Sequence, residues 1–503
     1  MVSETSAHTT GVPRSRVRAA PESWVTVLIA SQLAVWTLVP WLLSISLPLD
    51  VVQDGLAWGH EWQWGYYKHP PLPPWAVELF FNMFGDIGPF LLSQICVALT
   101  FALVYRIGRE LMPRREAAIG TVLLVGVFYF SVPTPEFNHN VAQLPVWAAM
   151  TLAYVKVLKT RAPRWWIALG LFTGLGVLTK YSSVVLLATM LLHAAMTPAV
   201  RTVFRSPGPY LAGIVATIVL VPHLYWVIQH DYTTISFFVA RAGRAQNIWQ
   251  DGLASVNFLA AQTLDIAPAI VIAGFGGFLS LRCFPRDLEN ENLRLLVFLG
   301  LGPALLTAAF SLVTGFGLRT MWGMPMWNLS GLLLVQAFSA QWEKVSLRRL
   351  AAATAVMFAA MPLAYAIDTA IGPAIFNVPS RTQWPDREIA KKLASDWSLM
   401  THEPLQIVAG DTWISSLIAM RHAPRPSVWI NGSYREAPWI TPARVASEGA
   451  LVVWQIGHQG ESPPSNLASL PGFRRGGVEK FAWPRSPKER PIQVGWGIVP
   501  PDR

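Results

Sequence analysis

Two acids and two cations lie close together just after the first long apolar run of the sequence. Asp50 and Asp54 are four residues apart, so on a short helix they would share a face. Lys68 and His69 follow, and two proline pairs directly after them stiffen the backbone. Such carboxylates could serve as a general base or hold a metal ion, and such cations suit a phosphate at the level of the lipid headgroups. The alternative for either acid is a helix cap or a solvated loop residue.

Further cations fall at the ends of apolar runs or in the segments between them. Lys180 lies in a short turn between two runs, where an ammonium group near the bilayer edge must snorkel or find an anion. Arg241, Arg244 and Arg319 lie in later segments, and their guanidinium groups suit bidentate contacts with phosphate or carboxylate. At least one of these arginines could instead face solvent or lipid headgroups.

The elements that must position these residues are membrane spans. The chain of 503 residues is 52% hydrophobic and only 14% charged, with a mean hydropathy of +0.38, which indicates a polytopic membrane protein. A hydrocarbon core of about 30 Å needs about 20 apolar residues per helix, and the apolar blocks predict eleven spans. The predicted spans centre on residues 24–46, 88–105, 117–132, 140–158, 165–179, 182–197, 209–229, 264–281, 293–313, 321–339 and 350–371.

The basic residues predict the orientation, because they fall on one side of the membrane if the spans alternate. These clusters are residues 14–18, 106–115, 156–164, 201 with 205, 282 with 286, and 344–349. By the positive-inside rule that side is the cytoplasm, so the net charge of +10 is a topology signal and does not indicate a nucleic-acid-binding protein. An odd number of spans then places the C-terminus outside.

This topology divides the chain into three parts. Residues 1–23 form a cytoplasmic tail, residues 24–373 the transmembrane domain, and residues 374–503 a small extracytoplasmic α/β domain. The outward segments are residues 47–87, 131–140, 230–265 and 315–319. Within residues 374–503 the patterns predict helices at 383–397 and 414–421, and strands at 404–411, 427–430 and 450–455.

The first outward segment resembles a known family. The stretch from Asp50 to Trp75, with Gly65-Tyr-Tyr-Lys-His-Pro-Pro-Leu72, is similar to the first extracytoplasmic loop of GT-C membrane glycosyltransferases. The relevant branch includes family 39-like enzymes, protein O-mannosyltransferases and lipid A aminoarabinose transferases. Two further segments fit: Glu136-Phe-Asn-His-Asn140 and Gly174-Leu-Gly-Val-Leu-Thr-Lys-Tyr181.

The resemblance implies a function and a place in the cell. The donor would be one sugar on a polyprenyl (undecaprenyl) phosphate, and the acceptor a hydroxyl or phosphate of a lipid, glycan or protein. Transfer would take place at the outer face of the bacterial cytoplasmic membrane, among membrane lipids and without nucleic acid.

The resemblance also implies residue roles. Its catalytic acid carries over to Asp50, with Asp54 as the competing choice, because Gln53 stands where many relatives have an acid. The donor phosphate would be bound by Lys68, His69, Lys180 and one or more of Arg241, Arg244 and Arg319.

The second outward segment departs from the family pattern. Many relatives have an acid near the position of Asn140, and Glu136 or His139 could substitute for it. The family allows a divalent metal ion, but the absence of that acid weakens the expectation of metal dependence. The alternative is that Asn138 or Asn140 caps the fourth span.

Two other classes of function compete with the enzyme. A lipid-linked-sugar flippase or secondary transporter would carry charges inside several spans and broken helices in matching halves, whereas the charges here gather at span ends. A non-catalytic assembly or sensor subunit is also open, since Gln53 and Asn140 could mark a decayed site.

Overall fold

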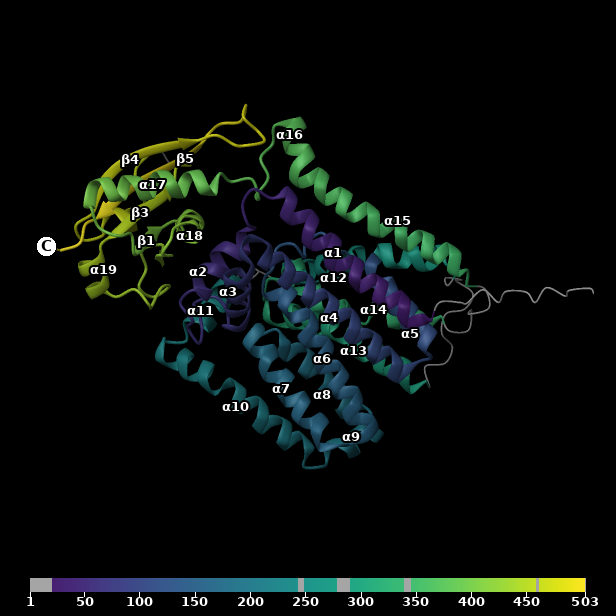
Figure 1. Ribbon diagram of the computed structural model, residues 1–503. Coiled ribbons are helices and arrows are strands. Elements are labelled where there is room, and N and C mark those ends of the chain that lie inside the picture. The colour runs from purple at the N-terminus through teal and green to yellow at the C-terminus, as the bar shows by residue number, and fades with distance from the viewer. Residues whose placement is uncertain (1–19, 243–247, 278–289, 339–344, 458–460, 503) are drawn as a thin grey trace, which may run out of the picture.

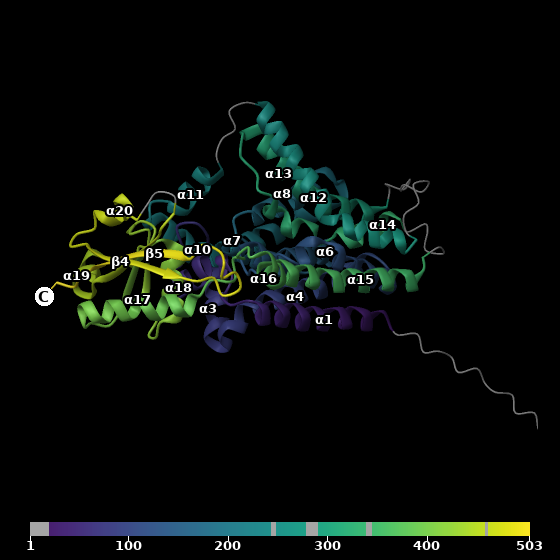
Figure 2. The same ribbon diagram turned by 90° about the horizontal axis from the view of Figure 1, so that it is seen from above.

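Helices make up most of the chain, and the long ones are apolar, as the hydropathy pattern predicts. The computed structural model describes residues 20–242, 248–277, 290–338, 345–457 and 461–502, and shows a bundle of helices with a sheet domain against one end (Figures 1 and 2). Seven of the described helical segments are long and apolar enough to cross a membrane, or eight if the bent pair α8–α9 is one span. The principal helices of these segments are α1 (Pro21–Leu43), α4 (Gly88–Leu111), α6 (His139–Thr160), α10 (Gly208–Gln229), α12 (Ile248–Phe275), α13 (Glu291–Thr314) and α15 (Leu347–Ala366).

Four of the eleven predicted spans correspond to shorter or broken helices. The third and tenth contain 3-10 segments, and the fifth and sixth are 17 and 14 residues long. Their elements are α5 (Arg114–Val122), η3 (Leu123–Gly126), η4 (Phe128–Phe130), α7 (Pro163–Thr179), α8 (Ser183–Met196), α9 (Pro198–Phe204), η5 (Thr320–Trp327) and α14 (Ser330–Ala337). The third and tenth pack against each other inside the bundle, where Gly331 meets the backbone of Gly120. Because protein surrounds them, irregular backbone is tolerated there.

The third outward segment, residues 230–265, is helical over most of its described length. The segment contains α11 (Thr233–Ala242), and α12 already begins at Ile248, not near residue 264. Leu253, Val256 and Leu264 lie on the exposed face of α12. Apolar residues at helical spacing therefore extend the helix beyond the most hydrophobic window.

The described basic clusters lie at one end of the bundle. The helix α4 runs from Gly88, beside the first loop, to the basic residues at its other end, and α6 runs in the same direction to Lys159. We call this end the basic end, and the end with residues 44–87 the loop end. The alternation behind the topology prediction therefore holds for the clusters at 106–115, 156–164, 201 with 205, and 348–349, whereas residues 14–18, 282 and 286 lie outside the described residues.

The first loop is a folded unit at the loop end. It consists of a π-helix η1 (Val51–Leu56), α2 (Ala57–Gly59), α3 (Leu72–Phe84) and a 3-10 turn η2 (Gly85–Ile87). Val51, Val52 and Leu56 are completely buried. At Gly59 an added Cβ would strike the backbone of Pro74, so α2 can approach α3 only because this residue lacks a side chain.

The C-terminal region forms the predicted small α/β domain. It follows η7 (Ile367–Ile371) and α16 (Gly372–Phe376), and its helices are α17 (Asp386–Thr401), α18 (Thr412–Arg421), α19 (Pro442–Glu448) and α20 (Ser465–Ala468). The sheet has the order β2-β1-β3-β5-β4, with strands β1 (Ile407–Gly410), β2 (Ser427–Ile430), β3 (Ala450–Gln455), β4 (Arg474–Phe481) and β5 (Ile492–Val499).

The sheet mixes two kinds of pairing. β1 pairs in parallel with β2 and β3, whereas β5 runs antiparallel to both β3 and β4. The three predicted strands are confirmed, but β4 and β5 were not predicted. β4 is a largely exposed edge strand that begins Arg-Arg-Gly-Gly, so it lacks the apolar alternation that marks a strand.

Candidate active site

The π-helix η1 places both loop acids at the loop end of the bundle. Asp50 is its N-cap residue and Asp54 lies within it, and both side chains are partly buried. Gly55 packs against Val77 of α3, which fixes the helix from behind. The short helix that would place the two acids on one face therefore exists, in a π-helical form that often occurs at functional sites.

Asp54 is paired with the loop lysine. The Lys68 ammonium donates to Asp54 Oδ1 at 2.9 Å, and it lies 5.6 Å and 5.3 Å from the ring centroids of Trp58 and Tyr67. Burial opposes the charge of Lys68, but the Asp54 carboxylate outweighs this and raises the pKa of Lys68. Burial also raises the pKa of Asp54, although Lys68 and Arg241 act against this shift. These two loop residues therefore neutralise each other.

Asp50 has no such cation within ion-pair distance among the described residues. Its backbone N–H donates to Glu136 Oε1 at 3.0 Å, and the Asn138 amide donates to its Oδ2 at 3.3 Å. Burial, with the nearby charges of Glu136 and Asp54, raises the pKa of Asp50 to about 7. A carboxyl group with such a pKa can accept a proton at neutral pH.

Lys180 approaches the same place from the turn between α7 and α8. Its ammonium donates to Asn140 Oδ1 at 2.6 Å and lies 5.7 Å from the ring centroid of Trp322. Burial lowers the pKa of Lys180 to about 7, and only the charge of Asp50 acts against this. In the part of the chain that the structure describes, no carboxylate lies within ion-pair distance of it. Lys180 is therefore a partly buried cation without a close counterion, which favours an anionic ligand.

Two histidines stack beside these residues. The centroids of the His69 and His139 rings are 4.1 Å apart. They lie 6.4 Å and 6.3 Å, respectively, from the centroid of the Trp58 ring. Burial, with His139 and the nearby lysines, lowers the pKa of His69 well below its ordinary value. His69 is then neutral at pH 7, so it can offer a phosphate a hydrogen bond but no charge.

The three predicted arginines differ in position. Arg241 is exposed on α11, close enough for its charge to act on Asp54 and His69. Arg319 is exposed at the start of η5, and its guanidinium has no ion pair or hydrogen bond among the residues described. Arg244 lies outside the described residues.

Several residues of this region were not predicted as site residues. Asn138 caps α6, as the alternative interpretation allowed, and at the same time donates to Asp50. Trp322 lies beside Lys180 although 142 positions separate them, and nothing in the sequence marks this contact. Tyr181 and His223 form a chain that ends on the carbonyl of Trp64, which ties α10 to the first loop.

The donor set does not fit a metal ion. Within the described ranges, no group of three or more His, Cys, Asp and Glu side chains could together hold one. Asn140 stands near the acids and binds Lys180 instead.

The C-terminal domain fixes the first loop from outside. Arg425 donates from Nη1 to both carboxylate oxygens of Glu78 at 2.8 Å, and from Nη2 to the carbonyl of Leu56 at 3.0 Å. Arg421 bridges Asp86 of η2 and Asp386 of α17 at 2.6 and 2.8 Å. A single acid within an apolar helix, as Glu78 is in α3, was a signal for a buried partner, but the partner itself could not be predicted.

The sequence matches a family described as dolichyl-phosphate-mannose-protein mannosyltransferase over residues 68–226. Two similar proteins come from Rhizobium johnstonii. The lipid A galacturonosyltransferase RgtD is 29% identical over 188 residues, which is 35% of this chain and 38% of that protein. The lipopolysaccharide core galacturonosyltransferase RgtB is 25% identical over 465 residues, 89% of this chain and 90% of that protein. The chain thus matches less than half of RgtD and nine-tenths of RgtB.

The fold is shared with a solved structure. ArnT from Cupriavidus metallidurans bound to undecaprenyl phosphate superposes with a TM-score of 0.63 at 14% identity, over 95% of this chain and 98% of ArnT. Its apo state gives the same values. The family match and the two relatives indicate a glycosyltransferase, and the fold is of the GT-C type that ArnT has.

Proposed function

We propose that the chain transfers one sugar from a polyprenyl phosphate donor to a hydroxyl or phosphate of a glycolipid, glycan or protein acceptor. The observation that carries this proposal is the partly buried pair Asp50 and Lys180, each held by an asparagine amide and neither neutralised by an ion pair among the described residues. ArnT holds undecaprenyl phosphate in the same fold, and RgtD and RgtB are named for transfer to lipid A and lipopolysaccharide core. A glycolipid acceptor and a galacturonosyl donor are therefore the first candidates.

Lys180 is the main phosphate-binding residue in this proposal. A bound phosphate places negative charge near its ammonium, which restores the protonated form that burial disfavours. His69 would donate an N–H to the same phosphate, and Arg241 would reach it from α11. Lys68 has a smaller share, since Asp54 already occupies it.

Asp50 is the base when the acceptor is a hydroxyl. Its carboxylate accepts the hydroxyl proton while the acceptor oxygen forms a bond to the anomeric carbon. The bond from that carbon to the phosphate oxygen breaks, and the lipid phosphate leaves with its electron pair. Lys180 stabilises the charge that develops on this phosphate, and a cation already fixed in a water-poor site does so with little reorganisation.

The basic end lies in the cytoplasm in this proposal, and the loop end and the C-terminal domain, residues 374–503, lie outside the bacterial inner membrane. Cysteine labelling tests this on a background without the two native cysteines. A membrane-impermeant maleimide should label Ser465→Cys in intact spheroplasts, whereas Arg205→Cys should react only after lysis. The reverse pattern would place the site on the cytoplasmic side.

A transfer assay tests the activity. Purified protein receives undecaprenyl phosphate carrying radiolabelled galacturonic acid, together with lipid A, core oligosaccharide or a protein acceptor. We expect label in one acceptor, loss of transfer in Asp50→Asn, and normal transfer in Asp396→Asn, which removes an acid from an exposed pair of α17. Release of lipid phosphate that survives both Asp50→Asn and Asp54→Asn would overturn the catalytic assignment.

A further inference from the structure

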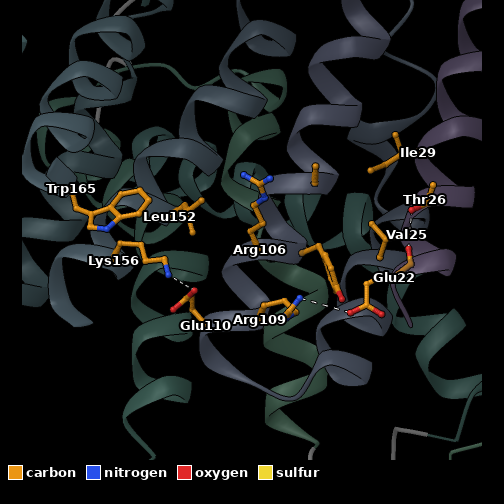
Figure 3. A pocket seen from close by; sticks show the side chains of 12 residues that line it. Glu22, Val25, Thr26, Ile29, Arg106, Arg109, Glu110, Leu152, Lys156 and Trp165 are labelled. Atoms are coloured by element: carbon orange, nitrogen blue, oxygen red, sulfur yellow. Dashed lines mark hydrogen bonds and ion pairs between the residues drawn. The ribbon is translucent and has the colours of Figure 1, made fainter. Parts of the chain in front are cut away.

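A cavity of about 530 Å³ lies at the basic end of the bundle, between α1, α4, α6 and α7 (Figure 3). Arg106 lies 18 residues along α4 from Gly88, so it is about 27 Å from the loop end of that helix. The cavity is therefore separate from the candidate active site.

The charged lining of the cavity is mainly basic. Arg109 and Arg114 share Glu22 at 3.8 and 3.6 Å, and Lys156 and Lys159 share Glu110. Arg106 lines the cavity as well, and it has neither an ion pair nor a side-chain hydrogen bond among the described residues. Three cations and two carboxylates thus line the cavity, and two further cations outside the lining, Arg114 and Lys159, pair with the same carboxylates.

A further donor lines the same cavity without an acceptor. The indole N–H of Trp165 is buried and has no hydrogen-bond partner within the described part of the chain. The Lys156 ammonium lies 5.8 Å from the centroid of the Trp165 ring. A buried donor without a partner is costly, and an anionic oxygen would satisfy it.

The lining changes from charged to apolar with depth in the bundle. The charged residues Glu22, Arg109 and Lys156 lie nearest the basic end of their helices, whereas Ile29, Ala102 and Leu152 lie one to two turns further in. A free phosphate needs only the charged layer. A molecule with an anionic head and an apolar chain fits both layers.

We propose that this cavity binds an anionic membrane lipid, with its phosphate between Arg106, Lys156 and the Trp165 indole and its acyl chain against Ile29 and Leu152. Basic pockets between helices at this level of a membrane suit lipid phosphates. The phosphate accepts the hydrogen bonds that Arg106 and Trp165 leave unmade. The lipid thereby joins α1 to α4, α6 and α7 at the end opposite the first loop.

Native mass spectrometry of the full-length protein tests the site. Phosphatidylglycerol is titrated into delipidated protein in detergent, with phosphatidylcholine as the neutral comparison and glycerol phosphate as the soluble headgroup. We expect phosphatidylglycerol to bind in preference to phosphatidylcholine and glycerol phosphate not to displace it. Arg106→Ala should weaken phosphatidylglycerol binding about tenfold, because one charge-assisted contact is lost.

The matched control is Arg205→Ala, which removes an exposed arginine at the same end but outside the cavity. Binding in this variant should equal that of the unsubstituted protein. Ile29→Trp, which fills the apolar layer, should also weaken lipid binding. Equal losses in Arg106→Ala and Arg205→Ala, or no loss in either, would overturn the site, and displacement by glycerol phosphate would overturn the lipid as its occupant.

Discussion

Charged side chains in two neighbouring regions at the loop end have different kinds of partner. Where the C-terminal domain meets the first loop, Arg421 and Arg425 form close ion pairs with Asp86, Asp386 and Glu78, at 2.6 to 2.8 Å. In the candidate active site, Asp50 and Lys180 are partly buried as well, but among the described residues the charged group of each hydrogen-bonds only to an asparagine amide.

Under the proposed function, the difference separates structural charges from functional ones. A buried charge without a counterion is unfavourable for folding, and a bound phosphate would offset this cost at Lys180. The paired region should therefore control stability, and the unneutralised region should control activity. Each of the following substitutions changes one region, and its effect on stability or on activity tests this division.

The largest effect should come from Asp50→Asn. This change removes the proposed base and should lower kcat by about 10²- to 10⁴-fold with a hydroxyl acceptor. The free energy of unfolding should change by less than about 1 kcal/mol, because the amide keeps the shape of the side chain and relieves a desolvated charge. Rates come from the transfer assay, and stability from denaturant unfolding in detergent. A stable Asp50→Asn protein with undiminished kcat would show that Asp50 is not the base.

Arg425→Met should have the opposite profile. Glu78 would remain as a buried carboxylate that has lost its arginine and keeps only the Asn82 amide and His60 beside it, which costs about 3–5 kcal/mol. Denaturant unfolding in detergent measures the loss. The Glu78→Gln variant is the matched partner, and the double substitution should be more stable than the sum of the two single changes predicts. Additive losses would mean that the pair does not join the domain to the loop.

The same contrast explains what the sequence could and could not predict. Apolar runs of about 20 residues mark spans directly, so seven or eight long spans and the small sheet domain were accessible. Asp50, Lys68 and Lys180 were chosen as candidate site residues because acids and cations gather in the outward segments and at span ends and match the pattern of the resemblance, and their roles stay predictions. The pairing of Asp54 with Lys68 was not predictable, because it depends on how fourteen intervening residues fold back.

Longer-range features were less accessible still. The contact between Glu78 and Arg425 joins residues 347 positions apart, and although Glu78 within an apolar helix signals a buried partner, nothing in the sequence marks Arg425 as that partner. The broken third and tenth spans were missed because hydropathy does not distinguish a segment facing lipid from one enclosed by other helices. Whether Asp50 or Asp54 is the acid that acts therefore depended on tertiary partners, not on the spacing of the two residues.

The pH dependence sharpens the assignment of Lys180. The donor-free enzyme needs Asp50 deprotonated and Lys180 protonated, and both pKa values lie at about 7. The value of kcat/KM should therefore rise as the pH increases toward 7, while Asp50 loses its proton, and fall above it, while Lys180 loses its own. Since the two groups interact, the apparent pKa values from the two limbs belong to the pair and not to either residue alone.

Lys180→Arg separates the two limbs. Arginine stays protonated, so the alkaline limb should disappear up to about pH 9 while the acid limb remains. Lys68→Arg is the control and should keep both limbs, because the pKa of Lys68 is already raised by Asp54. An alkaline limb that persists in Lys180→Arg would assign the falling limb to another group.

The smallest effect should come from Arg387→Ala, because Arg387 forms an exposed ion pair with the same carboxylate that Arg421 contacts. Arg387 contacts Asp86 at 3.0 Å, and Arg421 contacts the same carboxylate at 2.6 Å. The side chain of Arg387 is 74% exposed, whereas that of Arg421 is 10% exposed. Water screens the exposed pair, so its loss should cost at most about 0.5 kcal/mol and leave kcat unchanged. Arg421→Ala, which leaves Asp386 buried without its partner, should cost several times more in the same unfolding measurement. If the two arginines proved equal, the burial of an ion pair would not determine how much it contributes to the docking of the C-terminal domain.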